Sequence, residues 1–545
     1  MTLLRRHWRG ECLGIVGTAL IGLPAWALST SVGSAGIDAL RLHEAPYFLT
    51  GRKIAIGQVE IGRPSLFGLD KVASADLPVA VNRVFWLDEH PAPNQYVDGH
   101  AANVASVMVS QDKGLIGVSP NAQLYSAAVG PIRNRSGQPE ECLASQRVAL
   151  SNSGDVRAIN FSFGESLRRD PRTNPLLDGN ALLTQCIDWS ERVHDTLYVI
   201  AGNQGGGGIP IPTDNFNGIN VAYSRQVDGQ FTKVDFANSG SEPNFRPGRS
   251  LTTETNVGPR RSINIVAPGS RIEVIDPDGQ TRVVSGTSFA APHVVAVVAL
   301  LQEWGDRQIR SGLTGERLDT RQPMVMKAVL LNSADKLEDA GDGLLLGMTR
   351  TLYDESNLTW VESDAYRDTA IPLHAELGTG HLNAYRSLLQ LQGGQWSPQE
   401  TVPAIGWSYE GAGAAERSDA SNADAALARD YVFNQPLRAG SYLSATLTWE
   451  RLVLLNDANE NNLYDLGETF EDKGLKNLDL YLMRAEDNDI RDSIWSSVSD
   501  VDSVEHIFTE IPTTGQYKLR VVHQQPSGDE PVPPYALAWW AVAAQ

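Results

Sequence analysis

Short apolar stretches alternate with longer segments of mixed polarity from Lys53 onward. The apolar stretches are typical of buried strands, and the longer segments are typical of helices. Strands that alternate with helices indicate βαβ units and a mainly parallel sheet, whose ligands bind at the carboxyl ends of the strands. Strands are expected at 53–61, 122–130, 156–164, 196–208, 218–224, 262–270 and 271–276, and helices at 100–110, 140–153, 180–194, 289–301 and 324–334.

The pattern changes near Gln392. Residues 393–430 are small, polar and rich in turn formers, so this segment is expected to be a linker. Residues 431–545 contain short strand-like runs that are separated by turns, at the spacing of a sandwich. The expected architecture is therefore an α/β domain followed by an all-β sandwich of jelly-roll-like type.

One apolar helix begins directly after a Gly-Thr-Ser turn. Residues 289–301 are mostly Ala, Val and Leu, so this helix is expected to be buried on all sides. Ser288 lies at or just before the first turn, where free backbone N–H groups carry partial positive charge. A hydroxyl at this place can attack a carbonyl whose developing oxyanion meets those N–H groups. The alternative is that Ser288 only caps a core helix.

Two more loops at expected strand ends supply chemical partners for Ser288. His100 starts a helix of small residues, and Asn203 follows a buried strand at a tight turn. A nucleophile, a base and an amide donor together favour acyl transfer, in which His100 takes the hydroxyl proton. The Asn203 side-chain amide and the Ser288 N–H would hold the oxyanion. Each residue alone also has a purely structural interpretation, as a helix start, a turn or a cap.

These loops resemble the motifs of the subtilisin-like serine proteases, the subtilases of the peptidase S8 family. GTSFAAPHV around Ser288 resembles the nucleophile motif of the family. DGHAANVAS resembles the motif of its catalytic histidine, from which Ala101, Ala102 and Asn103 depart. AINFSFG, AGNQG, INIVAPG, MKAVLLNSA and GTGHLNA resemble further family segments in the family's order, over roughly residues 52–391.

The resemblance implies a fold, an activity and a set of site residues. It implies a catalytic domain over residues 52–392, built in three layers around a mainly parallel sheet. It also implies a serine endopeptidase that cleaves polypeptides through Ser288, His100 and Asn203, with no cofactor for catalysis. His293 lies on the wrong helix face to reach the hydroxyl and is expected to be structural. The altered histidine motif leaves a second hypothesis, a catalytically impaired subtilase-fold protein that binds peptides or surfaces.

The catalytic acid departs from the family pattern. Subtilases end their first strand in an Asp that is followed by Ser or Thr and then Gly, whereas this strand is IAIGQVEIG. Alignment on the apolar residues places Gln58 at the acid position, and alignment on the following glycine places Glu60 there. Both side chains point to the same face of the strand. We expect Glu60 to be the acid, because a carboxylate fixes the imidazole tautomer and stabilises the imidazolium, which an amide cannot do. Asp70 and Asp98 are lesser candidates, and the structural alternative is a solvated Glu60 that pairs with Arg63.

A second motif, DANENNLYDLGE, lies in the C-terminal region. Its oxygen-bearing residues have the spacing of an EF-type calcium loop, although the flanks are strand-like. We therefore expect a structural Ca²⁺ ion in a loop of the β-sandwich; the alternative is an acidic turn. The expected ligands are Asp457, Asn459, Asn461, the Leu463 carbonyl, Asp465 and Glu468.

The amino terminus is typical of an export signal. Residues 1–27 combine a positive start, a short apolar run and an Ala-Trp-Ala cleavage site, and a membrane anchor is the alternative. Residues 28–51 are expected to form an N-terminal arm that is too short for an independent pro-domain, so self-activation by pro-domain removal is not expected. The protein is then extracellular or periplasmic, with no transmembrane segment in the mature chain.

The net charge limits the classes of binding partner, and the cysteines indicate the redox state of the compartment. The formal net charge of -20 and the lack of a basic run argue against a nucleic-acid partner. We expect a monomer that acts on polypeptides. Cys12 leaves with the signal, and Cys142 and Cys186 are expected to form a disulfide in an oxidising compartment, with two buried thiols as the alternative.

Overall fold

The computed structural model describes most of the chain. The described residues are 28–132, 135–202, 210–227, 229–234, 256–257, 259–312, 318–411, 428–524 and 532–544. The expected export signal at 1–27 and the expected oxyanion residue Asn203 lie outside them. Among the helices that are described, none is both long and apolar enough to cross a bilayer.

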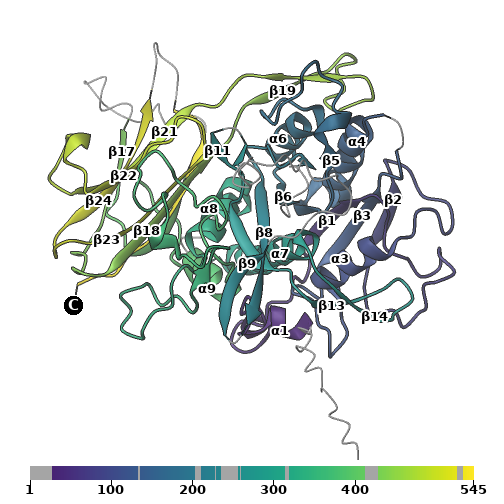
Figure 1. Cartoon of the computed structure of the whole chain (residues 1–545), viewed down its shortest axis with the longest axis horizontal. Coiled ribbons are helices and arrows are strands. Elements are labelled where there is room, and N and C mark those ends of the chain that lie inside the picture. Colours follow the sequence, from purple (N-terminus) through teal and green to yellow (C-terminus); the bar gives the residue numbers. More distant parts are fainter. Residues whose placement is uncertain are drawn as a thin grey trace, which may run out of the picture.

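A mainly parallel sheet forms the centre of the first region (Figure 1). Within the described residues it has nine strands, and the hairpin of β8 and β9 supplies its antiparallel pair. In spatial order, with β12 (Ile265–Pro268) beside β8, the strands are β15 (Leu352–Tyr353), β9 (Gln230–Val234), β8 (Ile219–Val227), β6 (Leu197–Ala201), β4 (Val156–Phe161), β1 (Ala55–Glu60), β3 (Gln123–Ala128) and β2 (Arg83–Trp86).

Helices cover both faces of this sheet, because the alternate residues of the central strands are apolar on both sides. In β1, Ile56 belongs to the core beneath α3 (Gly99–Val109) and α7 (Thr287–Ser311). Ala55 and Val59 belong to the opposite core, beneath α4 (Gln138–Ala149). α6 (Leu182–His194) lies beside α4 on that face. The expected three-layer α/β fold is therefore confirmed.

Among its described residues, the C-terminal region contains two four-stranded antiparallel sheets and a two-stranded hairpin, which confirms the expected all-β fold. One sheet contains β16 (Ile405–Glu410), β25 (Tyr535–Trp540), β18 (Tyr442–Trp449) and β23 (Val504–Glu510). The other contains β17 (Ala428–Val432), β24 (Tyr517–Gln524), β21 (Asn477–Arg484) and β22 (Trp495–Ser497). The structure corrects the expected linker at 393–430, because β16 lies inside it and pairs along its whole length with β25.

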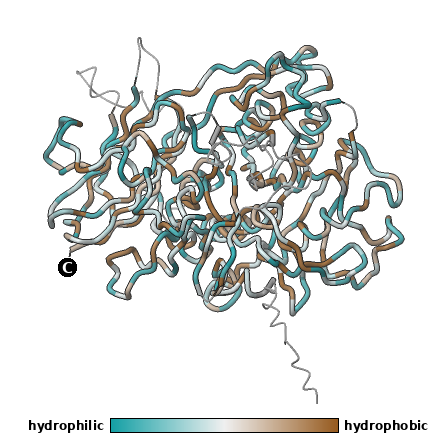
Figure 2. The backbone as a smooth tube through the Cα atoms, viewed as in Figure 1, coloured by the Kyte–Doolittle hydropathy of each residue, from teal (hydrophilic) through white to brown (hydrophobic). Residues whose placement is uncertain are grey.

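Shorter elements complete the described part of the chain. Figure 2 shows that many hydrophilic stretches lie in the outer loops. The remaining helices are α1 (Leu28–Val32), α2 (Leu40–His43), α5 (Ser151–Gly154), α8 (Pro323–Asn332) and α9 (Ala384–Gln392), with 3₁₀ turns at Leu167–Arg169, Leu318–Arg321, Trp360–Glu362 and Ile490–Asp492. The remaining strands are β5 (Glu165–Ser166), β7 (Pro210–Ile211), β10 (Asn256–Val257), β11 (Arg260–Arg261), β13 (Ile272–Ile275), β14 (Thr281–Val284), β19 (Val453–Asn456) and β20 (Thr469–Asp472).

The two regions are joined by buried polar contacts as well as by apolar packing. α8 lies against β18 and β25, and the Thr448 hydroxyl of β18 donates to the Met324 carbonyl at 2.9 Å. Arg451, next to β18, pairs with Asp188 of α6 at 2.6 Å, and both side chains are buried. Removal of one partner of such a buried pair is strongly destabilising. The sandwich is therefore packed firmly against the α/β region and is not merely connected to it by the chain.

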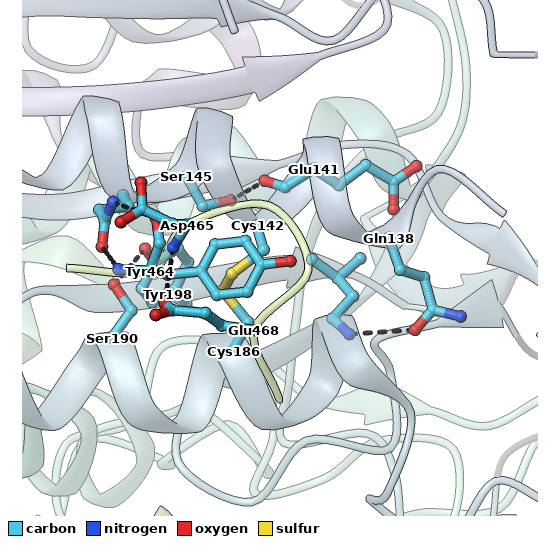
Figure 3. The surroundings of a disulfide bond; sticks show 12 residues. Gln138, Glu141, Cys142, Ser145, Cys186, Ser190, Tyr198, Tyr464, Asp465 and Glu468 are labelled. Atoms are coloured by element: carbon cyan, nitrogen blue, oxygen red, sulfur yellow. Dashed lines mark hydrogen bonds between the residues drawn. A yellow bond between two sulfur atoms is a disulfide. The ribbon is translucent and has the colours of Figure 1, made fainter. Parts of the chain in front are cut away.

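The expected disulfide between Cys142 and Cys186 is present and joins α4 to α6. The turn of the β19–β20 hairpin lies over it, with Tyr464 beside the two sulfur atoms (Figure 3). The Gln146 side chain donates to the Tyr464 carbonyl at 3.1 Å and accepts from the Tyr464 N–H at 2.6 Å. The disulfide thus supports both the sheet-covering helices and the attachment of the C-terminal region.

We predict that removing this disulfide lowers the free energy of unfolding. The bond closes a segment with a sequence separation of 44, and such crosslinks typically contribute about 2–4 kcal/mol. Urea unfolding of the oxidised protein, the reduced protein and the Cys142→Ser/Cys186→Ser variant measures the effect. The variant should not respond to reductant. Equal midpoints for oxidised and reduced wild type would contradict the prediction.

Candidate active site

Glu60 and His100 meet at the carboxyl end of β1. Glu60 is the last residue of that strand, and His100 is the second residue of α3. Glu60 Oε2 lies 3.2 Å from His100 Nδ1. The Glu60 side chain is 2% exposed and that of His100 is 40% exposed, so a buried carboxylate supports a ring that can still meet solvent or substrate.

Burial and the contact between the two side chains together shift the pKa of both groups. Burial raises the pKa of Glu60, and the charge of His100 opposes this only in part. Burial lowers the pKa of His100, but the charge and hydrogen bond of Glu60, together with the charge of Asp98, outweigh it, so this pKa is raised above its ordinary value. The pair therefore favours a proton on Nδ1 and leaves Nε2 as the ring nitrogen that can act as a base.

The other candidates for the acid have different partners. Gln58 donates its side-chain N–H to the Ala101 carbonyl at 2.9 Å. Asp70 pairs with Arg63 at 2.6 Å, and both side chains are fully buried. Asp98 is the N-cap of α3 and accepts from the Ala101 N–H at 3.1 Å. The structural alternative for Glu60 fails, because Glu60 is buried and Arg63 has Asp70 as its partner.

Ser288 lies in the first turn of α7, half-buried, as the sequence suggests. Gly286 precedes this turn with a φ of 146°, a conformation that favours glycine. The Ser288 hydroxyl donates to the Ser162 carbonyl at 3.1 Å, and the Ser162 hydroxyl donates to the Ser288 carbonyl at 2.9 Å. The ring of Phe289 lies 5.6 Å from that of His100, centroid to centroid. The His100 ring thus lies near the first turn of α7, and in this conformation the Ser288 hydroxyl donates to the Ser162 carbonyl.

His293 and Asn203 complete the residues that the sequence singled out. His293 is fully buried, and burial lowers its pKa to about 4. Its Nδ1 donates to the Phe289 carbonyl at 2.7 Å, and its Nε2 hydrogen-bonds with the Ser31 hydroxyl at 2.9 Å. It is therefore structural, as expected. Asn203 follows β6 in the sequence and lies outside the described residues.

A cavity of about 400 Å³ opens beside His100. Asn103, one turn further along α3, forms part of its wall and donates to the Ile275 carbonyl and to Asp276 at 3.0 and 2.9 Å. Sequence reasoning noted Asn103 only as a departure from the histidine motif. Its role in fixing the hairpin of β13 and β14 against α3 depends on residues that are far apart in the sequence. The lining residues are Val72, Gly99, His100, Asn103, Asp276, Pro277, Asp278, Arg282, Val284 and Phe289.

The expected calcium ligands lie in the turn between β19 and β20. Asp465 accepts from the side-chain amides of Asn459 and Asn461 at 2.8 Å each. Glu468 accepts two backbone N–H bonds at 2.8 Å, and Asp457 accepts the Asn462 N–H at 2.6 Å. Among the described residues, no group of three or more His, Cys, Asp and Glu side chains is arranged to hold a metal ion, so amide and carbonyl oxygens would have to complete this ligand set.

Comparison with known proteins places this site in a family. The model of the subtilase family matches residues 43–348. Subtilisin amylosacchariticus from Bacillus subtilis subsp. amylosacchariticus is 27% identical over 300 residues, which cover 53% of this chain and 66% of that protein. Thermitase from Thermoactinomyces vulgaris is 24% identical over 242 residues, which cover 44% of this chain and 68% of that protein. The matched part thus spans about two thirds of the length of these relatives.

Two solved structures resemble the chain more distantly. The prenylagaramide maturation protease PagA is 20% identical, with a TM-score of 0.38, and the match covers 62% of this chain and 92% of that one. A cold adapted subtilisin-like serine proteinase is 18% identical, with a TM-score of 0.36, and the match covers 57% and 92% of the two chains. Since the family model matches more than half of the sequence and spans both Glu60–His100 and the Ser288 turn, this chain belongs to the subtilase family.

Proposed function

We propose that this protein is a serine endopeptidase that hydrolyses polypeptides. The observation that carries the proposal is the 3.2 Å contact between Glu60 and His100, next to the helix turn that holds Ser288. Membership of the subtilase family supports a serine peptidase in general. The roles of the individual residues follow from chemistry and from the contacts described above.

In the first step Ser288 Oγ rotates away from Ser162 and attacks the carbonyl carbon of the scissile peptide bond. Its proton passes to His100 Nε2, while Glu60 holds Nδ1–H and stabilises the imidazolium. The substrate oxygen becomes an oxyanion, which the Ser288 N–H and the Asn203 amide stabilise. The C–N bond then breaks, and the His100 proton passes to the leaving amine.

In the second step water hydrolyses the acyl-enzyme. His100 takes a proton from the water, whose oxygen attacks the ester carbonyl. The bond to Ser288 Oγ breaks, and the proton returns to that oxygen as the carboxylic acid product leaves. The assignment of Asn203 to the oxyanion rests on its motif AGNQG, because this residue lies outside the described part of the chain.

We also propose that the protein is exported and works as a monomer outside the cytoplasm. The disulfide between Cys142 and Cys186 supports this, since such bonds persist in oxidising compartments. The export signal at 1–27 and the polypeptide substrate complete the proposal.

A fluorophosphonate probe tests the proposed function directly, because it labels only an activated serine. We expect covalent labelling of Ser288 in the wild type, located by mass spectrometry, and none in Ser288→Ala. His100→Ala should slow labelling about a thousandfold or more, since it removes the base. A wild type that is folded but not labelled would favour the alternative of a catalytically impaired, peptide-binding subtilase.

The Glu60–His100 contact also sets the pH dependence. Catalysis needs neutral His100, and its raised pKa places the acidic limb of kcat/KM above the pH expected for an ordinary histidine. Glu60→Gln removes the charge that raises this pKa, so the limb moves to lower pH. Turnover at neutral pH should fall by roughly 10⁴, the loss that an amide in place of the acid causes in a serine protease triad.

These changes are measured as the pH profile of hydrolysis of a chromogenic peptide. Glu89→Gln is the control, because it makes the same change at an exposed glutamate and leaves the Glu60–His100 contact in place. A Glu60→Gln variant with wild-type turnover and an unmoved limb would contradict the assignment of Glu60 as the acid.

We propose that the turn from Asp457 to Glu468 binds a structural Ca²⁺ ion. Excess Ca²⁺ should raise the unfolding midpoint of the wild type by a few degrees, because an ion that binds only the folded state stabilises it by mass action. Asp465→Asn and Glu468→Gln remove ligand charge and should abolish this shift. Mg²⁺ is the matched control, since it disfavours a large oxygen cage. No response of the wild type to Ca²⁺ would contradict the proposal.

A further inference from the structure

Gln58 is a buried polar residue in the centre of the sheet. The proposed mechanism gives it no role. It lies two positions before Glu60 in β1, on the same face, and is 0% exposed. Its Nε2 donates to the Ala101 carbonyl at 2.9 Å. Ala101 directly follows His100, so β1 reaches the first turn of α3 with two side chains, Glu60 to the ring and Gln58 to the next backbone carbonyl.

Gln58 destabilises the core in which it lies. Its side-chain oxygen Oε1 is buried and has no hydrogen-bond partner among the described residues. A half-satisfied buried amide destabilises a core relative to an apolar side chain of similar volume. Ile56, two positions earlier on the same face, is such an apolar residue. Natural proteins depart from the packing rules mainly where function requires it. The hydrogen bond from the Gln58 side chain leads to Ala101, the residue after His100.

The length of the two side chains explains why they occur together. A glutamate is one methylene longer than the aspartate of the family pattern. Its carboxylate therefore reaches Nδ1 of the imidazole at hydrogen-bond distance only if the gap between β1 and the start of α3 matches this greater length. Gln58 spans the same gap with a side chain of equal length. We infer that Gln58 is a positioning residue, whose amide holds the start of α3 at the distance from β1 at which Glu60 meets the ring of His100.

Other contacts of α3 make this inference testable without loss of the fold. Asp98 caps the helix, and Asn103 ties its next turn to Ile275 and Asp276 on the other side. Removal of the Gln58 bond should therefore shift the first turn rather than unfold it. The effect on catalysis rests on the proposed function, whereas the effect on the Glu60–His100 contact does not.

The first test follows the ionisation of His100 by NMR, with its signal assigned from its absence in His100→Ala. Gln58→Met keeps the length and removes the donor, and Gln58→Asn keeps the amide but is too short. Both should lower the pKa of His100 by about one pH unit, because a weakened Glu60 contact leaves burial as the larger influence.

Ser126→Ala is the matched control. Ser126 pairs with Gln58 in the sheet register and is fully buried. Its side-chain oxygen has no hydrogen-bond partner among the described residues, so it does not tie the sheet to α3 by a hydrogen bond. This variant should leave the pKa of His100 unchanged. If both Gln58 variants titrate as the wild type does, or if Ser126→Ala causes the same shift, the inference is wrong.

The second test is a double-mutant cycle on kcat. Gln58→Met should lower kcat by about 10- to 100-fold in the wild type, the size of effect that a small misplacement of a catalytic group causes. It should have almost no further effect in Glu60→Gln, because Gln58 acts through that contact. Additive losses would show that Gln58 only supports the fold.

The two tests separate this inference from the proposed function. A wild type without turnover or probe labelling would refute the endopeptidase but would leave the His100 titration as the decisive result for Gln58. Normal labelling together with an unshifted titration in both Gln58 variants would refute the positioning role alone.

Discussion

The site depends on one buried contact, between the Glu60 carboxylate and the His100 ring. A carboxylate at the end of a fully covered parallel strand loses its hydration and must recover that loss from a cation or from donors. Here one carboxylate oxygen meets Nδ1 of His100, and the other is buried with no hydrogen-bond partner in the part of the chain that the structure describes. The imidazole is therefore the group that makes this charge tolerable, and the charge in turn fixes the proton on the imidazole. The same Glu60–His100 pair thus makes the buried carboxylate tolerable and prepares the imidazole to act as a base.

The fold places this pair beside Ser288 through general properties of parallel sheets. Strands β1 and β4 end at the same edge, where the helices α3 and α7 begin. Helix beginnings carry free N–H groups and short side chains, so they suit a base and a nucleophile better than the middle of a helix does. The second region adds no described side chain to this site. It instead joins α6 and α8 through Arg451 and Thr448 and covers the disulfide with Tyr464, so it supports the helices behind the sheet.

The sequence predicted the order of the main strands and helices because apolar runs and helix starts are local signals. It missed β2 and β9, which are short and mix apolar residues with charged and polar ones, and it placed β16 in a linker because glycines and turn formers precede it. It favoured Glu60 over Gln58 on the chemistry of a carboxylate alone, since both side chains point to one face of the strand. Only the position of α3, set by distant contacts such as Asn103 with Asp276, separates a residue that meets the ring from one that meets the backbone. The pairing of Ser162 with Ser288 has no local signal at all.

The central claim is that Glu60 holds the proton of neutral His100 on Nδ1, which leaves Nε2 unprotonated and able to act as a base. Nitrogen-15 NMR of the imidazole in the full-length protein, at a pH above the pKa of His100, reports directly which nitrogen carries the proton. The account predicts the Nδ1–H tautomer in the wild type and a shift towards Nε2–H in Glu60→Gln. A wild type that carries the proton on Nε2, or a tautomer that does not respond to the loss of the Glu60 charge, would contradict it.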